Sequence, residues 1–327
     1  MKADCRRSRI TPVKRLTRQV FLIHVTRAPV KAVEAPGAKR EGYALKTEPD
    51  IDPGIDHESL AKALTGLAVR AGAYIMAVYE SDFAVTQKSD ESPVTAADEG
   101  AEKLILAGLH ELAPAIPVIS EEAASQGHLP AIAKRFFLVD PLDGTKEFIS
   151  RNGEFTVNIA LIENGMPVIG VVYAPALARL FYGFGKNQAF EVNAAPDDIR
   201  KDEVIENAKP KKIAARVAQA DGLVVVASRS HRDSQTDDYL KSFTVKEFKS
   251  AGSSLKFCLV ATGEADFYPR LGRTMEWDTA AGHAVLSAAG GEVTTLEGAP
   301  FIYGKVQDGF ANPFFIATGA TGAKAAK

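Results

Sequence analysis

The stretch FFLVDPLDGTKEFI, Phe136–Ile149, decides how the rest of the chain is interpreted. Its first four residues are apolar and rich in aromatic and β-branched side chains, which predicts a buried strand. Asp140 and Asp143 follow this strand around Pro141, where two carboxylates are poorly suited to core packing. They suit a hard cation, because Mg²⁺ prefers oxygen ligands and a single turn can direct both carboxylates at one point. In isolation, an Asp–Pro turn with a helix-capping Asp explains the same residues equally well.

Gly144 and Thr145 come directly after the second carboxylate. At this position a loop can turn into a helix and present backbone N–H groups to an anion. The stretch therefore predicts a metal site and a phosphate site next to each other.

Composition excludes several classes of protein. The chain has 327 residues, which is too long for one small core and suits two packed domains. It is 46% apolar and 24% charged with a net charge of −2, so no positive field favours nucleic acid as a partner. Cys5 and Cys258 are the only cysteines, which excludes a disulfide framework or a zinc site and favours a reducing, cytoplasmic location.

The first part of the chain differs from the rest. Residues 1–40 contain 11 Lys and Arg against only Asp4 and Glu34. We predict that residues 1–56 are a basic, disordered extension outside the fold. The alternatives are a transit peptide and an arm that contacts anionic lipid at the inner face of the cell membrane. No apolar run approaches the roughly 18 residues needed to span a bilayer.

Helices and strands alternate irregularly along the remainder of the chain. This pattern favours an α/β fold of layered sheets and helices over a barrel. We predict an N-terminal α+β domain over residues 57–193 and a C-terminal α/β domain over residues 194–327. Apolar periodicity predicts helices over residues 57–80, 96–112, 253–262 and 278–289, and strands over 83–88, 116–119, 156–163, 167–173, 180–184, 189–192, 223–227, 245–248, 265–269, 292–295 and 314–318.

Three more carboxylates lie at the boundaries of predicted elements. Asp98 and Asp278 are in the first turns of helices, and Glu121 follows a short strand. Each has a simple structural explanation, since acidic residues stabilise helix N-termini. If all of them converge with Asp140 and Asp143, they must repel one another strongly unless cations lie among them.

Four segments together resemble the signature motifs of the inositol monophosphatase superfamily. They are PVTAAD (93–98), SEE (120–122), VDPLDGTKEF (139–148) and EWDTAAG (276–282), in the order expected for that family. The resemblance covers residues 57 to 319 and implies a five-layer αβαβα sandwich and Mg²⁺-dependent, lithium-sensitive phosphatase activity. The N-terminal extension corresponds to nothing in the family.

The resemblance implies a set of metal ligands. Glu121, Asp140 and the Leu142 carbonyl would bind one Mg²⁺, and Asp140, Asp143 and Asp278 a second. A third and weaker ion would be held by Glu121 and water, so two to three ions are expected.

The resemblance also implies catalytic and substrate-binding residues. Asp98 and Thr145 would take a proton from the attacking water, with Glu121 counted among the catalytic residues, and the N–H groups of Gly144 and Thr145 would hold the scissile phosphate. Four further segments resemble, within the superfamily, the bacterial CysQ-type 3′(2′),5′-bisphosphate nucleotidases: KEF (146–148), SRSH (228–231), GSSLK (252–256) and YPR (268–270). The residues implied in nucleotide binding are Ser228, His231, Ser253, Ser254, Lys256 and Arg270.

Local interpretations of the nucleotide-binding residues remain open at this point. Ser253 and Ser254 also fit a helix N-cap, and Lys256 also fits a solvated helix face. The expected reaction is hydrolysis of the 3′-phosphate of adenosine 3′,5′-bisphosphate to AMP, with its sulfated analogue PAPS as a second substrate. The alternatives are an inositol or sugar phosphatase of the same fold, and a binding or regulatory protein without catalysis. The sequence leaves the oligomeric state open.

Overall fold

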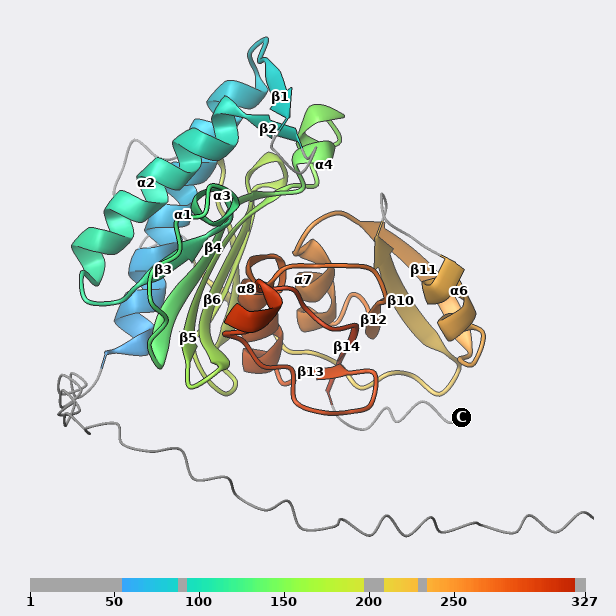
Figure 1. Cartoon of the computed structure of the whole chain (residues 1–327). Coiled ribbons are helices and arrows are strands. Elements are labelled where there is room, and N and C mark those ends of the chain that lie inside the picture. Colours follow the sequence, from blue (N-terminus) through green and yellow to red (C-terminus); the bar gives the residue numbers. More distant parts are fainter. Residues whose placement is uncertain (1–54, 88–92, 197–208, 229–233, 321–327) are drawn as a thin grey trace, which may run out of the picture. The chain divides into compact units, whose positions relative to one another are not determined.

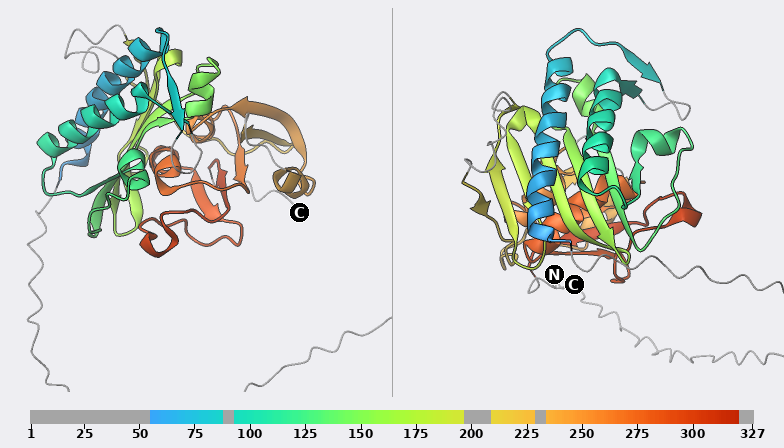
Figure 2. Two further views of the ribbon diagram at one scale, coloured as in Figure 1. Left: turned by 45° about the horizontal axis from the view of Figure 1, so that its top comes forward. Right: turned by 90° about the vertical axis from the view of Figure 1, so that its left-hand side faces the viewer.

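Two β-sheets alternate with three layers of helices in the part of the chain that the structure describes (Figures 1 and 2). This computed structural model describes residues 55–87, 93–196, 209–228 and 234–320. The described residues all belong to one compact unit. The predicted basic extension, residues 1–56, lies almost wholly outside the described residues.

The first sheet has seven strands in the order β3-β4-β5-β6-β7-β8-β9. β3 and β4 are parallel, and every other neighbouring pair is antiparallel. The strands are β3 (Val118–Ser120), β4 (Arg135–Asp143), β5 (Thr156–Glu163), β6 (Met166–Ala174), β7 (Arg179–Gly183), β8 (Ala189–Asn193) and β9 (Lys211–Lys212).

The second sheet has five strands in the order β11-β10-β12-β14-β13. Its strands are β10 (Leu223–Ser228), β11 (Val245–Ala251), β12 (Phe267–Arg270), β13 (Glu292–Thr295) and β14 (Phe315–Thr318). A separate antiparallel pair is formed by β1 (Val85–Gln87) and β2 (Pro93–Thr95).

The helices occupy three layers (Figure 1). α1 and α2 cover one face of the seven-stranded sheet, α7 and α8 lie between the two sheets, and α6 covers the outer face of the five-stranded sheet. The helices are α1 (His57–Tyr79), α2 (Ala96–Leu112), α3 (Glu121–Ser125), α4 (Thr145–Ile149), α6 (Ser234–Leu240), α7 (Leu255–Ala261) and α8 (Glu276–Ala288), with short 3₁₀ turns η1 (Pro175–Leu177) and η3 (Val306–Asp308).

Strand β4 packs against helices on both faces of the seven-stranded sheet. Alternate side chains of a strand point to opposite faces of its sheet. Phe137 and Val139 therefore join the apolar cluster under α1 and α2, whereas Phe136 and Leu138 join the cluster around α7 and α8. A strand that is buried on both faces reads as a continuous apolar run, as this one does. The predicted αβαβα arrangement is confirmed.

Helix α1 is long and apolar enough to cross a membrane by length and composition alone. Half of its most apolar window is buried inside the fold, and Leu64, Ala68 and Ile75 are fully enclosed. This burial is what a core helix of the sandwich requires, because one face must pack on the sheet.

The predicted elements agree with the structure apart from their ends. The predicted helix over residues 96–112 coincides with α2, whereas the helix predicted from residue 253 begins at Leu255. Strand β9 lies beyond residue 194 but pairs with β8 in the seven-stranded sheet. The division into domains 57–193 and 194–327 stays a prediction.

His283 gives the fold a pH-dependent stability. Its side chain on α8 is 2% exposed, its Nδ1 lies 3.0 Å from the Tyr303 hydroxyl, and it faces the Phe301 ring. Burial lowers its pKa from 6.5 to about 3, so between these values the unfolded chain binds a proton that the folded chain does not. From pH 7 to pH 5 we expect the free energy of unfolding of the wild type to fall by about 2 kcal/mol more than that of the His283→Gln variant.

Urea unfolding of both proteins at the two pH values checks this expectation. The comparison with the variant cancels the contributions of all other titrating groups. Equal losses of unfolding free energy in the two proteins would contradict a neutral, buried His283.

Candidate active site

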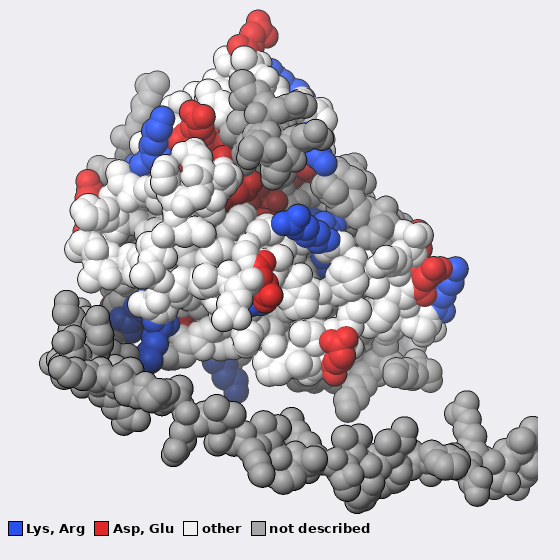
Figure 3. Space-filling view, viewed as in Figure 1, with Lys and Arg blue, Asp and Glu red and all other residues white. Residues whose placement is uncertain are grey.

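A pocket lies where the ends of β3 and β4 face the first turns of α7 and α8. Figure 3 shows acidic side chains in a hollow on this side of the molecule, with basic side chains next to them. The cavity has a volume of about 320 Å³ and is lined by Glu121, Asp140, Leu142, Asp143, Gly144, Thr145, Lys146, Glu147, Ser253, Lys256, Phe257, Tyr268, Arg270, Arg273, Thr274, Asp278 and Thr279. Most of the sequence-predicted site residues that the structure describes therefore line one cavity.

The parallel pairing of β3 with β4 places Glu121 beside Asp140. Ser120 pairs with Val139, so the next residues along the two strands are neighbours. The buried Glu102 of α2 fixes this junction, because its Oε1 accepts hydrogen bonds from the Ser120 hydroxyl and the Ala123 N–H. This support of the Glu121 turn depends on a tertiary contact, which no local sequence pattern around Glu102 indicates.

A bulge in β4 sets the directions of Asp140 and Asp143. Asp140 pairs with Asn158 and Asp143 with Thr156, so β4 carries two residues, Pro141 and Leu142, against one in β5. Such bulges bend a strand and redirect its side chains. Asp140 Oδ1 accepts the Leu142 N–H at 3.1 Å, which further fixes its carboxylate.

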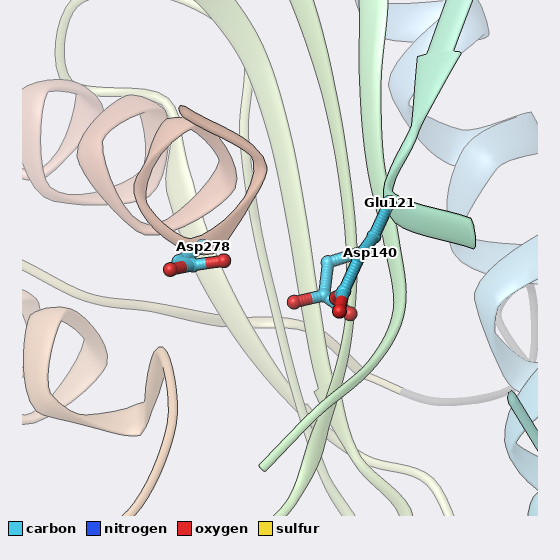
Figure 4. Close-up of side chains that lie close together, drawn as sticks. All are labelled: Glu121, Asp140 and Asp278. Atoms are coloured by element: carbon cyan, nitrogen blue, oxygen red, sulfur yellow. The ribbon is translucent and has the colours of Figure 1, made fainter. Parts of the chain in front are cut away.

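Asp278 reaches the same point from α8. It is the third residue of this helix rather than its N-cap, and its Oδ2 accepts the Met275 N–H at 2.8 Å. Figure 4 shows Asp278 opposite Asp140 and Glu121, which come from the other side of the pocket. One oxygen from each of these three carboxylates lies within 4.8 Å of the other two.

The carboxylate cluster is electrostatically unfavourable by itself. Desolvation raises the pKa of Asp143 to about 6, and the charges of Glu147 and Glu121 add to the increase while Lys256 opposes it. Desolvation, followed by the charges of Asp143 and Glu121, also raises the pKa of Asp278 well above its ordinary value. Because the donor set is entirely hard oxygen, the residues fit a divalent cation such as Mg²⁺.

Asp98 and Thr145 are brought together from separate elements. The Thr145 hydroxyl lies 3.2 Å from Asp98 Oδ1. The other carboxylate oxygen, Oδ2, accepts the Thr95 N–H at 2.8 Å and the Thr95 hydroxyl at 2.7 Å. Asp98 is therefore held by a capping box at the start of α2 and contacts Thr145 with its remaining oxygen.

Gly144 connects strand β4 to α4. Its φ of 93° lies in the left-handed region, which favours glycine. A Cβ at this position would lie 2.2 Å from the Ser253 hydroxyl, so no larger residue fits. Gly144 and Thr145 both line the pocket, as the phosphate-binding prediction requires.

Lys256 and Arg270 form a cationic side of the pocket. Lys256 is only 5% exposed, which contradicts the alternative of a solvated helix face. Desolvation lowers its pKa to about 8, although the charge of Asp143 opposes this. Among the described residues, Arg270 Nε is one of two buried polar side-chain atoms without a hydrogen-bond partner.

Two serines precede α7, and Ser254 occupies its N-cap position, as the local alternative expects. Neither caps the helix through its side chain. The Ser253 hydroxyl donates to the Asp143 and Glu154 carbonyls at 2.7 and 2.9 Å, and the Ser254 hydroxyl donates to the Asp278 carbonyl at 2.8 Å. Their hydroxyls thus contact the main chain at three acidic residues, of which Asp143 and Asp278 line the pocket.

The remaining nucleotide-binding predictions concern Ser228 and His231. Ser228 ends β10, and its side chain and His231 lie outside the described residues. Sequence reasoning missed Glu147, Glu154, Arg273 and Thr274. Glu147 lies within the VDPLDGTKEF motif, which is the only sequence signal for any of them.

Comparisons with known proteins agree with this geometry. The inositol monophosphatase family model matches residues 56–324. The 3′(2′),5′-bisphosphate nucleotidase CysQ of Salmonella typhimurium is 46% identical over 254 residues, covering 77% of this chain and 96% of that protein. CysQ of Escherichia coli K12 is 46% identical over 251 residues, covering 76% and 95%.

Solved structures give the same result. The crystal structure of CysQ from Bacteroides thetaiotaomicron superimposes with a TM-score of 0.65 at 39% identity, covering 80% of this chain and 97% of that one. An inositol monophosphatase from Anabaena has a TM-score of 0.62 at 23% identity, covering 82% and 93%, and supports the fold alone. The chain belongs to the inositol monophosphatase family.

Proposed function

We propose that the protein is a Mg²⁺-dependent phosphomonoesterase that converts adenosine 3′,5′-bisphosphate to AMP and inorganic phosphate, with PAPS, converted to APS, as a second substrate. The observation that carries this proposal is a single cavity that is lined both by the carboxylate cluster and by the cationic side chains of Lys256 and Arg270. A volume of about 320 Å³ is in the range of small-molecule sites. The similarity to CysQ proteins supports the same substrate.

The carboxylate part of the pocket would hold the metal and the scissile phosphate. Glu121, Asp140, Asp143 and Asp278, with the Leu142 carbonyl, are the proposed ligands for two to three Mg²⁺ ions. Bound Mg²⁺ neutralises charge on the phosphoryl group and polarises it toward attack. The N–H groups of Gly144 and Thr145 would orient the phosphate, and Asp98 would accept the proton of the attacking water through the Thr145 hydroxyl.

Lys256 and Arg270 are the proposed second-phosphate subsite. The buried lysine lies over the Tyr268 ring at 5.5 Å, which restricts the position of its ammonium group. An anion near the unpaired Arg270 Nε would supply the hydrogen bond that this atom lacks. Ser253 and Ser254 stay predictions as phosphate ligands, since their hydroxyl protons are donated to main-chain carbonyls.

The test is phosphate release from adenosine 3′,5′-bisphosphate, adenosine 3′-monophosphate and inositol 1-phosphate, with Mg²⁺ and with or without lithium. We expect the bisphosphate to be preferred and lithium to inhibit. We expect Lys256→Met to lower kcat/KM for the bisphosphate about tenfold to hundredfold and to leave the monophosphate almost unchanged, because one charge-assisted contact to phosphate is lost. Methionine keeps most of the volume of the buried side chain.

Lys186→Met, on an exposed turn, is the matched control and should behave as wild type. Preference for the inositol ester would favour an inositol or sugar phosphatase and refute the second-phosphate subsite. Inactivity on all three compounds would favour a binding or regulatory role. The cytoplasmic location and the lipid contact of residues 1–56 stay predictions.

A further inference from the structure

Glu154 contacts the segment before α7 through both its side chain and its main chain. Its Oε2 accepts the Gly252 N–H at 2.9 Å, and its carbonyl accepts the Ser253 hydroxyl at 2.9 Å. Glu154 itself is fixed by its own N–H, which donates to Asn152 Oδ1 at 2.8 Å. Glu154, which lies just before β5, thus holds both Gly252 and Ser253, about 100 positions later in the chain.

The contact is closely packed and imposes an unusual backbone. A Cβ at Gly252 would lie 2.5 Å from the Glu154 carbonyl oxygen and 3.0 Å from the Glu154 Cβ, so glycine is required there. Ser253 has a φ of 50°, in the left-handed region that few non-glycine residues adopt. Such a conformation persists only where surrounding contacts enforce it, and Glu154 supplies two of these contacts.

The segment in turn positions Lys256. The Lys256 ammonium donates to the Ser253 carbonyl at 2.6 Å, so the direction of that carbonyl fixes the charged group. Desolvation and the charge of Arg270 lower the pKa of Lys256, whereas the charges of Asp143, Glu147 and Glu154 raise it. Ser253, the residue with the left-handed backbone, therefore connects Glu154 to Lys256.

We propose that Glu154 is a positioning residue for the second-phosphate subsite. It holds Gly252 and Ser253 in the conformation that directs the Lys256 ammonium into the pocket. The inference rests on the proposed function, because it assigns Lys256 the second phosphate. Glu154 is not expected to contact substrate or to take part in the bond-breaking step.

The test compares Glu154→Ala and Glu154→Gln with wild type on adenosine 3′,5′-bisphosphate and adenosine 3′-monophosphate. We expect Glu154→Ala to raise KM for the bisphosphate about tenfold, the effect of losing one charge-assisted hydrogen bond. The kcat, and kcat/KM for the monophosphate, should change less than about twofold. Glu154→Gln should restore the wild-type KM, because its amide oxygen can still accept the Gly252 N–H.

A cycle with Lys256→Met separates this inference from the proposed function. If Glu154 acts through Lys256, the double variant should bind the bisphosphate no worse than Lys256→Met alone. If Lys256→Met leaves the preference for the bisphosphate intact, the subsite is wrong and the role of Glu154 with it. If Lys256→Met removes the preference but Glu154→Ala does not, only the role of Glu154 is wrong.

Further variants exclude a merely structural effect. Glu297→Ala, at an exposed turn, is the matched control. Equal losses of kcat on both substrates by Glu154→Ala would overturn the proposal. Should that variant fail to fold in thermal melting, Glu154→Asp tests the same contact, because it keeps the charge but is one methylene too short; a wild-type KM in that variant would likewise overturn the proposal.

Discussion

Asp140→Asn is expected to lower kcat by about three orders of magnitude, because it removes the charge of a proposed metal ligand from the carboxylate cluster. Asp140 is 1% exposed and has a carboxylate oxygen within 4.8 Å of oxygens from both Glu121 and Asp278. The asparagine keeps the shape of the side chain and can still accept the Leu142 N–H. The loss should therefore report the charge rather than a change of fold.

The same variant should be more stable than wild type when divalent cations are removed. The carboxylates of this pocket are poorly solvated and close together: desolvation first, and then the charges of neighbouring carboxylates, raise the pKa values of Asp143 and Asp278. Removing one charge relieves part of the repulsion among them, by an expected gain of about 1 kcal/mol. With saturating Mg²⁺ the order should reverse, because only the wild type gains the full binding free energy.

Thermal melting in EDTA and in Mg²⁺, together with steady-state kinetics, provides both measurements. Asp308→Asn, which makes the same chemical change on an exposed 3₁₀ turn, is the control. An Asp140→Asn variant that melts lower in EDTA and is still stabilised by Mg²⁺ to the wild-type extent would exclude Asp140 as a metal ligand.

The fold could be predicted because its strands and helices have clear periods. β4 reads as a buried strand from four consecutive apolar residues, and α2 from its apolar stripe and first-turn acids. The bulge at Pro141 and Leu142 was not predictable, because it is defined by the register with β5. This register directs Asp140 and Asp143, so the sequence supplied the ligand types while the pairing of strands supplies their direction.

The cationic side of the pocket was the least predictable part from local sequence. Ser253, Ser254 and Lys256 fit a capped helix with a solvated lysine, and only the family resemblance favoured binding roles. In the structure, the Ser253 hydroxyl instead contacts the carbonyls of Asp143 and Glu154, which lie about 100 positions earlier in the chain. No local sequence pattern indicates a role for Glu154, because its partners Gly252 and Ser253 lie in the segment that connects β11 to α7.

Asp98→Asn is expected to lower kcat about 10²- to 10³-fold with little change in KM, the range for loss of a general base. Both carboxylate oxygens of Asp98 accept hydrogen bonds, one from Thr145 and the other from Thr95. An asparagine has only one acceptor oxygen, so its side chain cannot accept hydrogen bonds from both Thr95 and Thr145, and it can no longer take a proton from the Thr145 hydroxyl. Loss of the cap would cost about 1 kcal/mol of stability, which thermal melting detects separately from kcat.

Thr145→Val and Thr145→Ser distinguish a proton path from a structural contact. Valine keeps the branched shape but cannot pass a proton to Asp98, whereas serine keeps the hydroxyl that lies 3.2 Å from the carboxylate. We expect valine to match the kcat loss of Asp98→Asn and serine to retain most activity. If the two residues act as one unit, the Asp98→Asn/Thr145→Val double variant should lose no more than either single variant. Losses that multiply would mean that Asp98 and Thr145 contribute independently, and the water would then need a different base.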